Sequence, residues 1–306
     1  MDLTTRIRER GDGFVLFAVT PPRQTTPADR LAEIAAATKD RLWDLGLDGL
    51  VLYDIDDESS RNPAERPFPF SPTVDPAQYR DEYLQDWPTP VVVYRAVGKY
   101  QHDRLSTWLS AQDTSRTLTV MVGAASSGSA PALRLTDAQA MRRDLTPDLL
   151  LGGVAIPERH SRREDEHLRL IGKQAAGSSF FVTQVVYDVN AAKNLVSDYK
   201  YECAQQGLEP VPIVFTFSVC GSMKTLEFMR WLGVDVPKWI ENDLRHAADP
   251  LAESLEQAYD TALELIAFCR RLGMPFGLNI ESVSIRREEI EASVDLAARL
   301  IAELRD

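Results

Sequence analysis

A polar pair, Thr183 and Gln184, stands directly after the aromatic and β-branched run 180–182, and a helical pattern follows it. A run of that composition predicts a strand that is buried on both faces. In parallel α/β folds, side chains at the ends of strands converge on the ligand. The pair is therefore expected either to contact a substrate or only to end the strand by hydrogen bonding its last carbonyls, and the segment alone favours neither.

Acidic side chains also stand at the ends of strand-like segments. Asn279 and Glu281 alternate with apolar residues at the end of one such segment, so both point to the same side of the strand. Asp56 belongs to an acidic run at 54–58, which is equally typical of a solvated loop. A positioned carboxylic acid typically contributes about 10²- to 10⁴-fold to a rate by proton transfer. Asp56, Glu281 and Glu158 are therefore candidates for acid catalysis, and Asn279 is a candidate substrate contact.

Aromatic side chains end three of the strand-like segments, at Tyr53, Tyr94 and Phe217. Flat rings can stack on a flat heterocyclic ligand. Aromatic residues more often belong to a core, but the hydroxyl tips of the two tyrosines favour a place at a site. All three are candidate substrate contacts.

Two further segments offer groups that bind anions. The run 123–131 is rich in Gly and Ser, and the backbone amides around Gly123 and Ser126 could approach a ligand closely, although flexible connectors have the same composition. The basic cluster at 159–163 includes His160 and is followed by an acidic run that partly cancels its charge.

The elements that must position these groups follow one repeating pattern. A strand followed by a helix recurs along the chain, which predicts a closed (βα)₈ barrel that uses residues 1–306 as a single domain. The strands are expected at 14–19, 49–53, 91–94, 118–122, 149–155, 180–184, 213–217 and 276–280. Helices are expected at 26–45, 101–111, 136–143, 164–174, 190–206, 222–231, 237–245, 251–272 and 285–305. The long proline-rich segment 54–87 is expected to be either a lid or disordered.

Composition narrows the class of protein. The net charge of −12 over 306 residues disfavours nonspecific binding to nucleic acid, which depends on neutralised phosphates. The sequence contains no apolar run of membrane-spanning length and no signal-peptide pattern, so we expect a cytoplasmic protein without a membrane partner. Cys203, Cys220 and Cys269 lack CxxC spacing, which argues against a disulfide framework or a zinc site, and no metal is expected.

Three patches, taken in order, resemble the methylenetetrahydrofolate reductase family. They are the double proline and arginine at 21–23, the Pro-Glu-x-His pattern at 157–160, and the stretch from Lys173 to the Thr-Gln pair at 183–184. The resemblance runs in order along nearly the whole chain, although only these patches are distinctive.

The resemblance implies a barrel that binds flavin, reduced nicotinamide and folate at the carboxyl ends of its strands, with a role in one-carbon metabolism and methionine biosynthesis. By this resemblance Gln184 contacts the folate, and Phe217 matches an aromatic residue that sandwiches the ligand. Lys173 matches a lysine near the flavin phosphates, and Glu158 and His160 match the family's cofactor-binding patch.

Two departures from the family pattern change the expected chemistry. Ala18 stands where the family carries its catalytic glutamate, and the sequence around Gly123 lacks the family's Arg-Gly-Asp, whose aspartate tunes the flavin. A flavin-free branch of the family passes hydride directly from NADH or NADPH to methylenetetrahydrofolate, and the chain is similar to it in length. Asp56 and Glu281 are then the expected replacement acids, because strands two and eight both adjoin strand one in a closed barrel.

Two other functions fit the same residues. One is a folate- or pterin-binding homologue without hydride chemistry, with a methyl-transfer or regulatory role, which the alanine at position 18 would allow. The other is a flavin-dependent barrel enzyme with an unrelated substrate. Whether flavin binds, which nicotinamide is used and the oligomeric state stay open.

Overall fold

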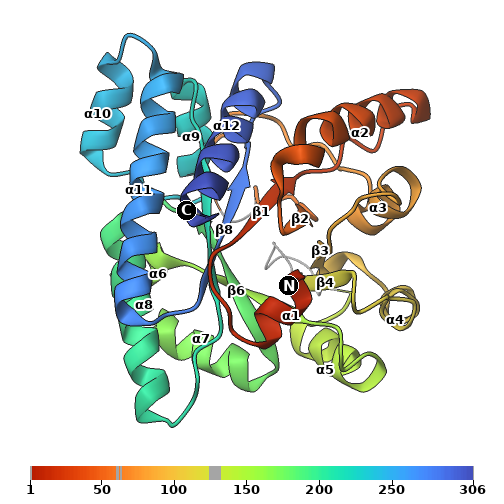
Figure 1. The fold of residues 1–306 in the computed structure, drawn as a ribbon. Helices are drawn as coiled ribbons and strands as arrows, with labels where there is room; N and C mark the ends of the chain where they lie inside the picture. Colours follow the sequence, from red (N-terminus) through yellow and green to blue (C-terminus); the bar gives the residue numbers. More distant parts are fainter. Residues whose placement is uncertain (1, 60–61, 63, 124–131, 306) are drawn as a thin grey trace.

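The computed structural model describes residues 2–59, 62, 64–123 and 132–305. Eight parallel strands form a closed barrel in chain order, and the last pairs with the first (Figure 1). The strands are β1 Phe14–Val19, β2 Gly49–Leu52, β3 Val91–Ala96, β4 Thr117–Val122, β5 Leu151–Ala155, β6 Ser178–Val185, β7 Ile213–Ser218 and β8 Phe276–Glu281. The predicted barrel is confirmed.

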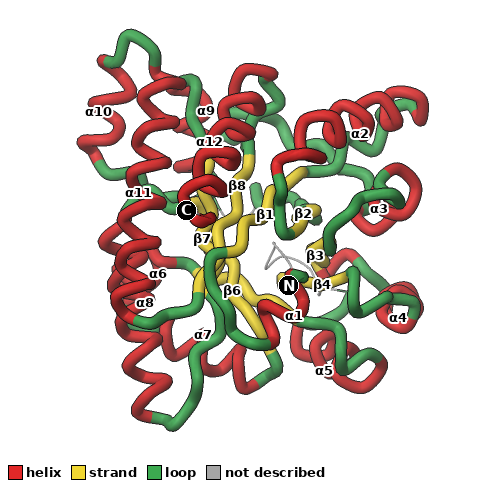
Figure 2. The backbone as a smooth tube through the Cα atoms, in the orientation of Figure 1, coloured by secondary structure: helices red, strands yellow, loops and turns green. Residues whose placement is uncertain are grey.

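Helices form a layer around the barrel, as the colours of Figure 2 show. They are α1 Leu3–Arg8, α2 Ala28–Leu42, α3 Pro76–Tyr83, α4 His102–Ser110, α5 Leu135–Leu145, α6 Pro157–Arg163, α7 Glu166–Ala175, α8 Val189–Gln205, α9 Met223–Trp231, α10 Lys238–His246, α11 Pro250–Leu272 and α12 Arg287–Arg305. Short 3₁₀ helices, η1 Trp43–Leu45 and η2 Val97–Lys99, follow α2 and β3. Within the described part of the chain, no helix combines the length and the apolar character needed to cross a bilayer.

Alternate strand residues face the barrel interior or the helices, as the period of a strand requires. Phe14 and Phe180 pack with Val214 inside the barrel, whereas Phe17 and Phe215 pack among the surrounding helices. Each such side chain contributes about 1.5–3 kcal/mol by leaving water. The apolar composition of the strands is therefore explained by burial on both of their faces.

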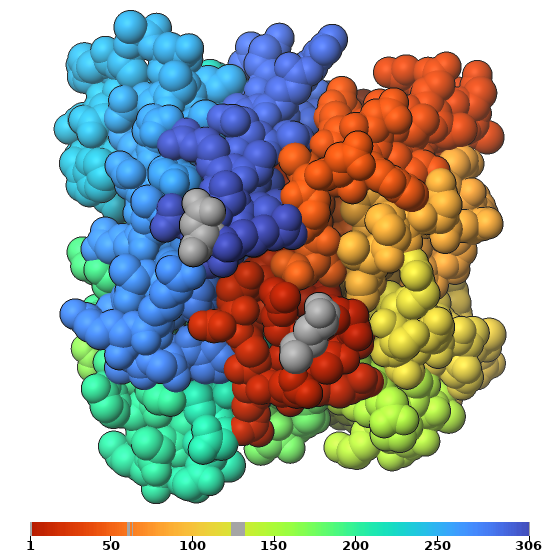
Figure 3. All heavy atoms as spheres, in the orientation of Figure 1, coloured from red at the N-terminus to blue at the C-terminus, as the bar shows by residue number. Residues whose placement is uncertain are grey.

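The first helix closes the amino-terminal end of the barrel. The Asp2 carboxylate caps α1 by accepting a hydrogen bond from the Thr5 amide at 3.0 Å. Leu3 and Ile7 on this helix join the interior cluster that includes Leu16. Figure 3 shows the N-terminal segment filling the middle of this face. The carboxyl ends of the strands are thus the open end of the barrel.

Besides α1, two helices lie where none was predicted. Within the proline-rich segment, Asp75 caps α3 through the amides of Ala77 and Gln78 at 2.9 and 3.3 Å, and Pro76 occupies the first helical position, which suits its fixed φ. Pro157 begins α6 in the same way. Proline therefore starts these helices, whereas we interpreted it as a mark of loop.

A methyl group at position 152 tests the packing of the interior. The Cβ of Gly152→Ala would lie 2.5 Å from Phe180 Cζ and 2.7 Å from Val120 Cγ2, so we expect overpacking to lower the free energy of unfolding by about 1–3 kcal/mol. Urea denaturation measures this change. The matched control is Gly172→Ala on the exposed face of α7, where no atom lies within 4 Å; it should gain roughly 0.5–1 kcal/mol. Equal stability of the two variants would contradict this account of the core.

Candidate active site

A cleft of about 1580 Å³ opens at the carboxyl ends of the strands. Sites for a single small molecule usually measure about 300–1,000 Å³, so this cleft has room for more than one ligand. Many of the predicted site residues line it: Tyr53, Asp56, Tyr94, Gly123, Glu158, Lys173, Thr183, Gln184 and Glu281.

Glu281 lies on the floor of this cleft, beside the residue that departs from the family pattern. In the pairing of β1 with β8, Ala18 is the direct partner of Glu281, and partners on adjacent parallel strands point to the same face. Tyr53 donates a hydrogen bond of 2.5 Å from its hydroxyl to Oε2 of Glu281, and Asn279 Nδ2 donates to the same hydroxyl oxygen at 3.0 Å. The small side chain of Ala18 thus has a buried carboxyl group as its neighbour.

Burial changes the acidity of this group. Loss of water raises the pKa of Glu281 to about 7, although the hydrogen bond from Tyr53 acts in the opposite direction. Burial and the nearby Glu281 raise the pKa of Tyr53 well above its usual value, so the phenol keeps its proton and stays a donor. The ring of Tyr94 packs edge-on against Tyr53 with centroids 4.9 Å apart. The carboxyl group can therefore hold or release a proton near neutral pH.

The Thr-Gln pair has two different environments. Thr183 Oγ1 accepts from the Thr216 amide at 2.9 Å, and Thr216 Oγ1 donates to the Thr183 carbonyl oxygen at 2.8 Å, so Thr183 mainly joins β6 to β7. Gln184 Nε2 donates to the Leu232 carbonyl oxygen at 2.8 Å. Among the described residues Oε1 of Gln184 has no hydrogen-bond partner, which leaves it as an acceptor for a ligand.

The wall of the cleft formed by α6 and α7 carries a second buried carboxyl group, Glu158, and a lysine, Lys173, that is bonded to neighbouring groups. Burial raises the pKa of Glu158 to about 7, and its Oε2 has no hydrogen-bond partner in the described part of the chain. Arg159 bonds to the buried Glu166 at 2.9 Å. Lys173 donates to the Val154 carbonyl oxygen and lies 3.8 Å from Glu166, while burial lowers its pKa. The lysine is thus already occupied by groups of the protein.

Three predicted site residues do not line the cleft, and a fourth is not among the described residues. Phe217 is fully buried and packs between the barrel and its helices rather than on a ligand. His160 is bonded to Asp198 and does not line the cleft. Asn279 is fully buried and reaches the cleft only through hydrogen bonds to Tyr53 and Thr216, at 3.0 and 3.2 Å. Ser126 lies outside the described residues.

Sequence reasoning missed the part of the cleft where the proline-rich segment meets α9. The Arg66 guanidinium lies over the rings of Phe70, Phe228 and Trp231 at 5.3, 5.3 and 5.1 Å from their centroids. Trp231 donates from Nε1 to the Ala64 carbonyl oxygen at 2.9 Å. No local pattern signals these contacts, because they join residues far apart in the chain.

The residues present do not fit the family's usual flavin site. After β4 the described chain offers Gly123, which has no side chain, and the nitrogen of Lys173 is engaged by the wall of the cleft. Within the described residues no carboxylate at the end of β4 is available to tune a flavin.

Fold and cleft define the chain as a (βα)₈-barrel protein with a ligand site at the carboxyl ends of its strands and a buried acid on the floor of that site. The model of the methylenetetrahydrofolate reductase family matches residues 138–278. The chain belongs to this family. No curated protein matches it in sequence.

One of the solved structures is strongly similar to this chain. An uncharacterized protein from Clostridium thermocellum, described as binding two copies of 5-methyl-5,6,7,8-tetrahydrofolic acid, has 43% sequence identity and a TM-score of 0.87, covering 98% of this chain and 99% of that one. A xylanase from Thermobacillus composti has 13% identity and a TM-score of 0.48 over 98% of this chain and 100% of its own, too little for any argument.

The pKa of Glu281 has a consequence for stability. The Glu281 carboxyl binds its proton more tightly in the folded chain than in the unfolded chain, where it titrates near 4.5. The protonated carboxyl therefore stabilises the fold fully below about pH 4.5, and this stabilisation is lost as the pH rises to about 7. The loss is on the order of 3 kcal/mol. Since Glu281→Gln cannot ionise, its free energy of unfolding should rise by about that amount relative to wild type between about pH 4.5 and pH 8.

Urea denaturation across this pH range measures the difference. Glu241→Gln is a control in which the free energy of unfolding should fall. Arg230, Lys238 and Arg245 lower the pKa of Glu241, so its charged form stabilises the fold. Parallel pH dependence of wild type and Glu281→Gln would show that this carboxyl is not perturbed.

Proposed function

We propose that the chain is a folate oxidoreductase that transfers hydride from NADH or NADPH to the methylene carbon of 5,10-methylenetetrahydrofolate and forms 5-methyltetrahydrofolate. The observation that carries this proposal is the Glu281 carboxyl beside Ala18, at the place where the family keeps its acid. Family membership and the relative that binds the methylated folate support the substrate class.

Glu281 is proposed to supply the proton. Opening of the folate ring breaks one bond between the methylene carbon and nitrogen, and that nitrogen takes the proton while the carbon becomes an iminium electrophile. Hydride from the nicotinamide then completes the methyl group. Tyr53 bonds Oε2 of Glu281 at 2.5 Å, which leaves Oε1 to carry the proton toward the cleft. A pKa of about 7 suits this transfer at neutral pH.

Other side chains of the cleft are proposed to orient the ligands. Oε1 of Gln184 can accept from an N–H group of the pterin, and Tyr94 offers a ring edge close to Tyr53. Asp56 lines the cleft at its rim and stays the second candidate acid. Arg23 and Arg163 also line the cleft and suit the negative charges of a dinucleotide or of a folate tail.

One specific observation favours a second function, binding of folate without hydride chemistry. The relative with 43% identity is described as binding two copies of the methylated folate, which is the product of the proposed reaction. The size of the cleft would allow two such ligands here as well. A protein that only carries folate, or that takes part in methyl transfer, would need the same cleft to bind the folate but would need no catalytic acid.

A nicotinamide oxidation assay separates the two functions. We expect the purified protein, without added flavin, to oxidise NADH or NADPH only when methylenetetrahydrofolate is present, because Glu281 can protonate the folate and the hydride needs no other carrier. Loss of the nicotinamide absorbance and formation of the methylated folate are measured together. Tight binding of both folates without any oxidation would select the binding function instead.

Replacing the proposed acid tests the mechanism. Glu281→Gln keeps the size of the side chain but removes the proton, so kcat should fall by about 10²- to 10⁴-fold. The loss should be largest below about pH 7, where the wild-type carboxyl is protonated. Rates measured from acidic to basic pH under saturating folate check this expectation.

Two further variants serve as controls. Glu158→Gln removes the other cleft carboxyl whose pKa lies at about 7, and it should leave the pH profile of kcat in place. Gln184→Ala should raise KM for the folate more than it lowers kcat. If Glu158→Gln changes the pH profile of kcat and Glu281→Gln does not, Glu158 in the wall of the cleft would be the proton donor instead.

A further inference from the structure

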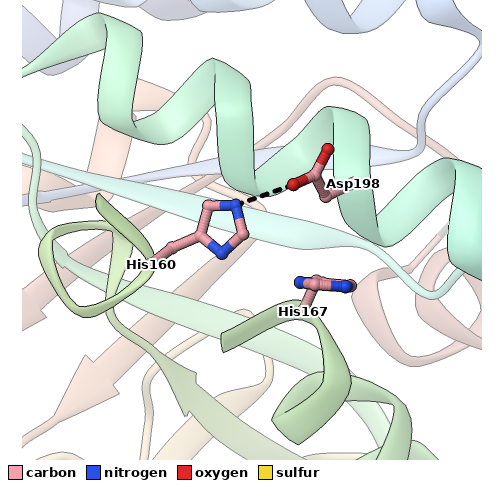
Figure 4. A group of neighbouring side chains, drawn as sticks. All are labelled: His160, His167 and Asp198. Atoms are coloured by element: carbon pink, nitrogen blue, oxygen red, sulfur yellow. Dashed lines mark hydrogen bonds and ion pairs between the residues drawn. The ribbon is translucent and has the colours of Figure 1, made fainter. Parts of the chain in front are cut away.

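Three potential metal ligands meet outside the cleft. His160 lies on α6, His167 on α7 and Asp198 on α8, and Figure 4 shows their side chains turned toward one another (Figure 4). One ligand atom from each residue lies within 4.8 Å of the ligand atoms of the other two. His160 and His167 lie on consecutive helices, but Asp198 lies 38 residues from His160, so no short sequence motif signals the cluster.

The distances come close to those of a coordination sphere. His160 Nε2 lies 3.0 Å from Asp198 Oδ2. Two ligands of a tetrahedral zinc ion with bonds of about 2.0–2.2 Å lie about 3.4 Å apart. The remaining separations of up to 4.8 Å therefore close when side chains move by about 1.4 Å. Rotation of the half-buried His167 can supply such a movement.

Two imidazole nitrogens of this cluster have no hydrogen-bond partner among the described residues. The side chain of His160 is only 4% exposed, whereas that of Asp198 is 53% exposed. Nδ1 of His160 and Nδ1 of His167 are both buried and have no hydrogen-bond partner among the described residues. The two rings meet edge to face, with centroids 5.3 Å apart. A buried imidazole normally satisfies both of its nitrogens, so these groups have unused capacity.

We propose that His160, His167 and Asp198 bind a divalent metal ion of the zinc class. Two imidazoles and one carboxylate suit zinc, whereas magnesium and calcium prefer oxygen ligands alone. The exposed side of Asp198 gives the ion access from solvent, and water takes the fourth position. The absence of CxxC spacing, from which we expected no metal, does not bear on this cysteine-free set of ligands.

The position of the site gives the ion a structural role. Glu158 and Arg162 on α6 line the cleft, while His160 on the same helix faces α8. A bound ion would tie α6 to α7 and α8 from the side remote from the cleft. Ion binding at the cluster does not depend on the chemistry proposed for Glu281.

Zinc titration of the metal-free full chain tests the proposal. Isothermal calorimetry on chelator-treated protein should show one zinc ion per chain, and His167→Gln and Asp198→Asn should each weaken its binding by at least about tenfold. The same zinc addition should raise the thermal unfolding midpoint of wild type, but not that of His167→Gln. Both replaced side chains are at least partly exposed, so folded variants are expected, and circular dichroism of the metal-free proteins verifies this.

His102→Gln is the matched control, since this exposed histidine on α4 belongs to no such cluster within the described residues. It should bind zinc as wild type does. Binding that is substoichiometric in wild type, or that is unchanged in both His167→Gln and Asp198→Asn, would overturn the proposal and leave the cluster as a histidine–aspartate ion pair between helices.

Discussion

The register of β1 against β8 places Ala18 and Glu281 at the same level of the closed barrel, and the character of the site follows from that pairing. Side chains alternate strictly along a strand, so a shift of one residue would turn the carboxyl group toward the helices. In the observed register it faces the barrel interior at the floor of the cleft and meets the Tyr53 hydroxyl. An acid that the family draws from one strand can thus be supplied by the next, because closure makes the first and last strands neighbours.

A second constraint acts at the mouth of the barrel. The segment after β2 is anchored at its start by Asp54, which accepts from the Ala96 amide at 2.8 Å and from Tyr100 at 2.6 Å. Near its end a β-bridge joins Arg23 to Thr73. Between these anchors it reaches α9, where Trp231 bonds to Ala64. The segment therefore forms part of the cleft wall, and the aromatic residues around Arg66 are brought together only by this crossing.

The sequence predicted correctly those features that depend on one strand or helix alone. Apolar strands predicted the barrel, and the alternation around Glu281 predicted the direction of its side chain correctly. Prediction failed where direction depends on tertiary packing. His160 shares α6 with Glu158, yet the turn of the helix points it toward α8. Phe217 lies next to the last residue of β7, but its position in the alternation faces the helices. Neither outcome can be read from a motif that places residues near a site without giving their orientation.

The closed amino-terminal end has a consequence for molecular traffic. Leu3 and Ile7 on α1, with the apolar layer above them, fill the barrel below the cleft. Within the described residues, the barrel axis therefore offers no passage from the cleft to the amino-terminal face. Ligands that reach the floor beside Glu281 enter from the carboxyl ends of the strands and leave on that same side of the protein.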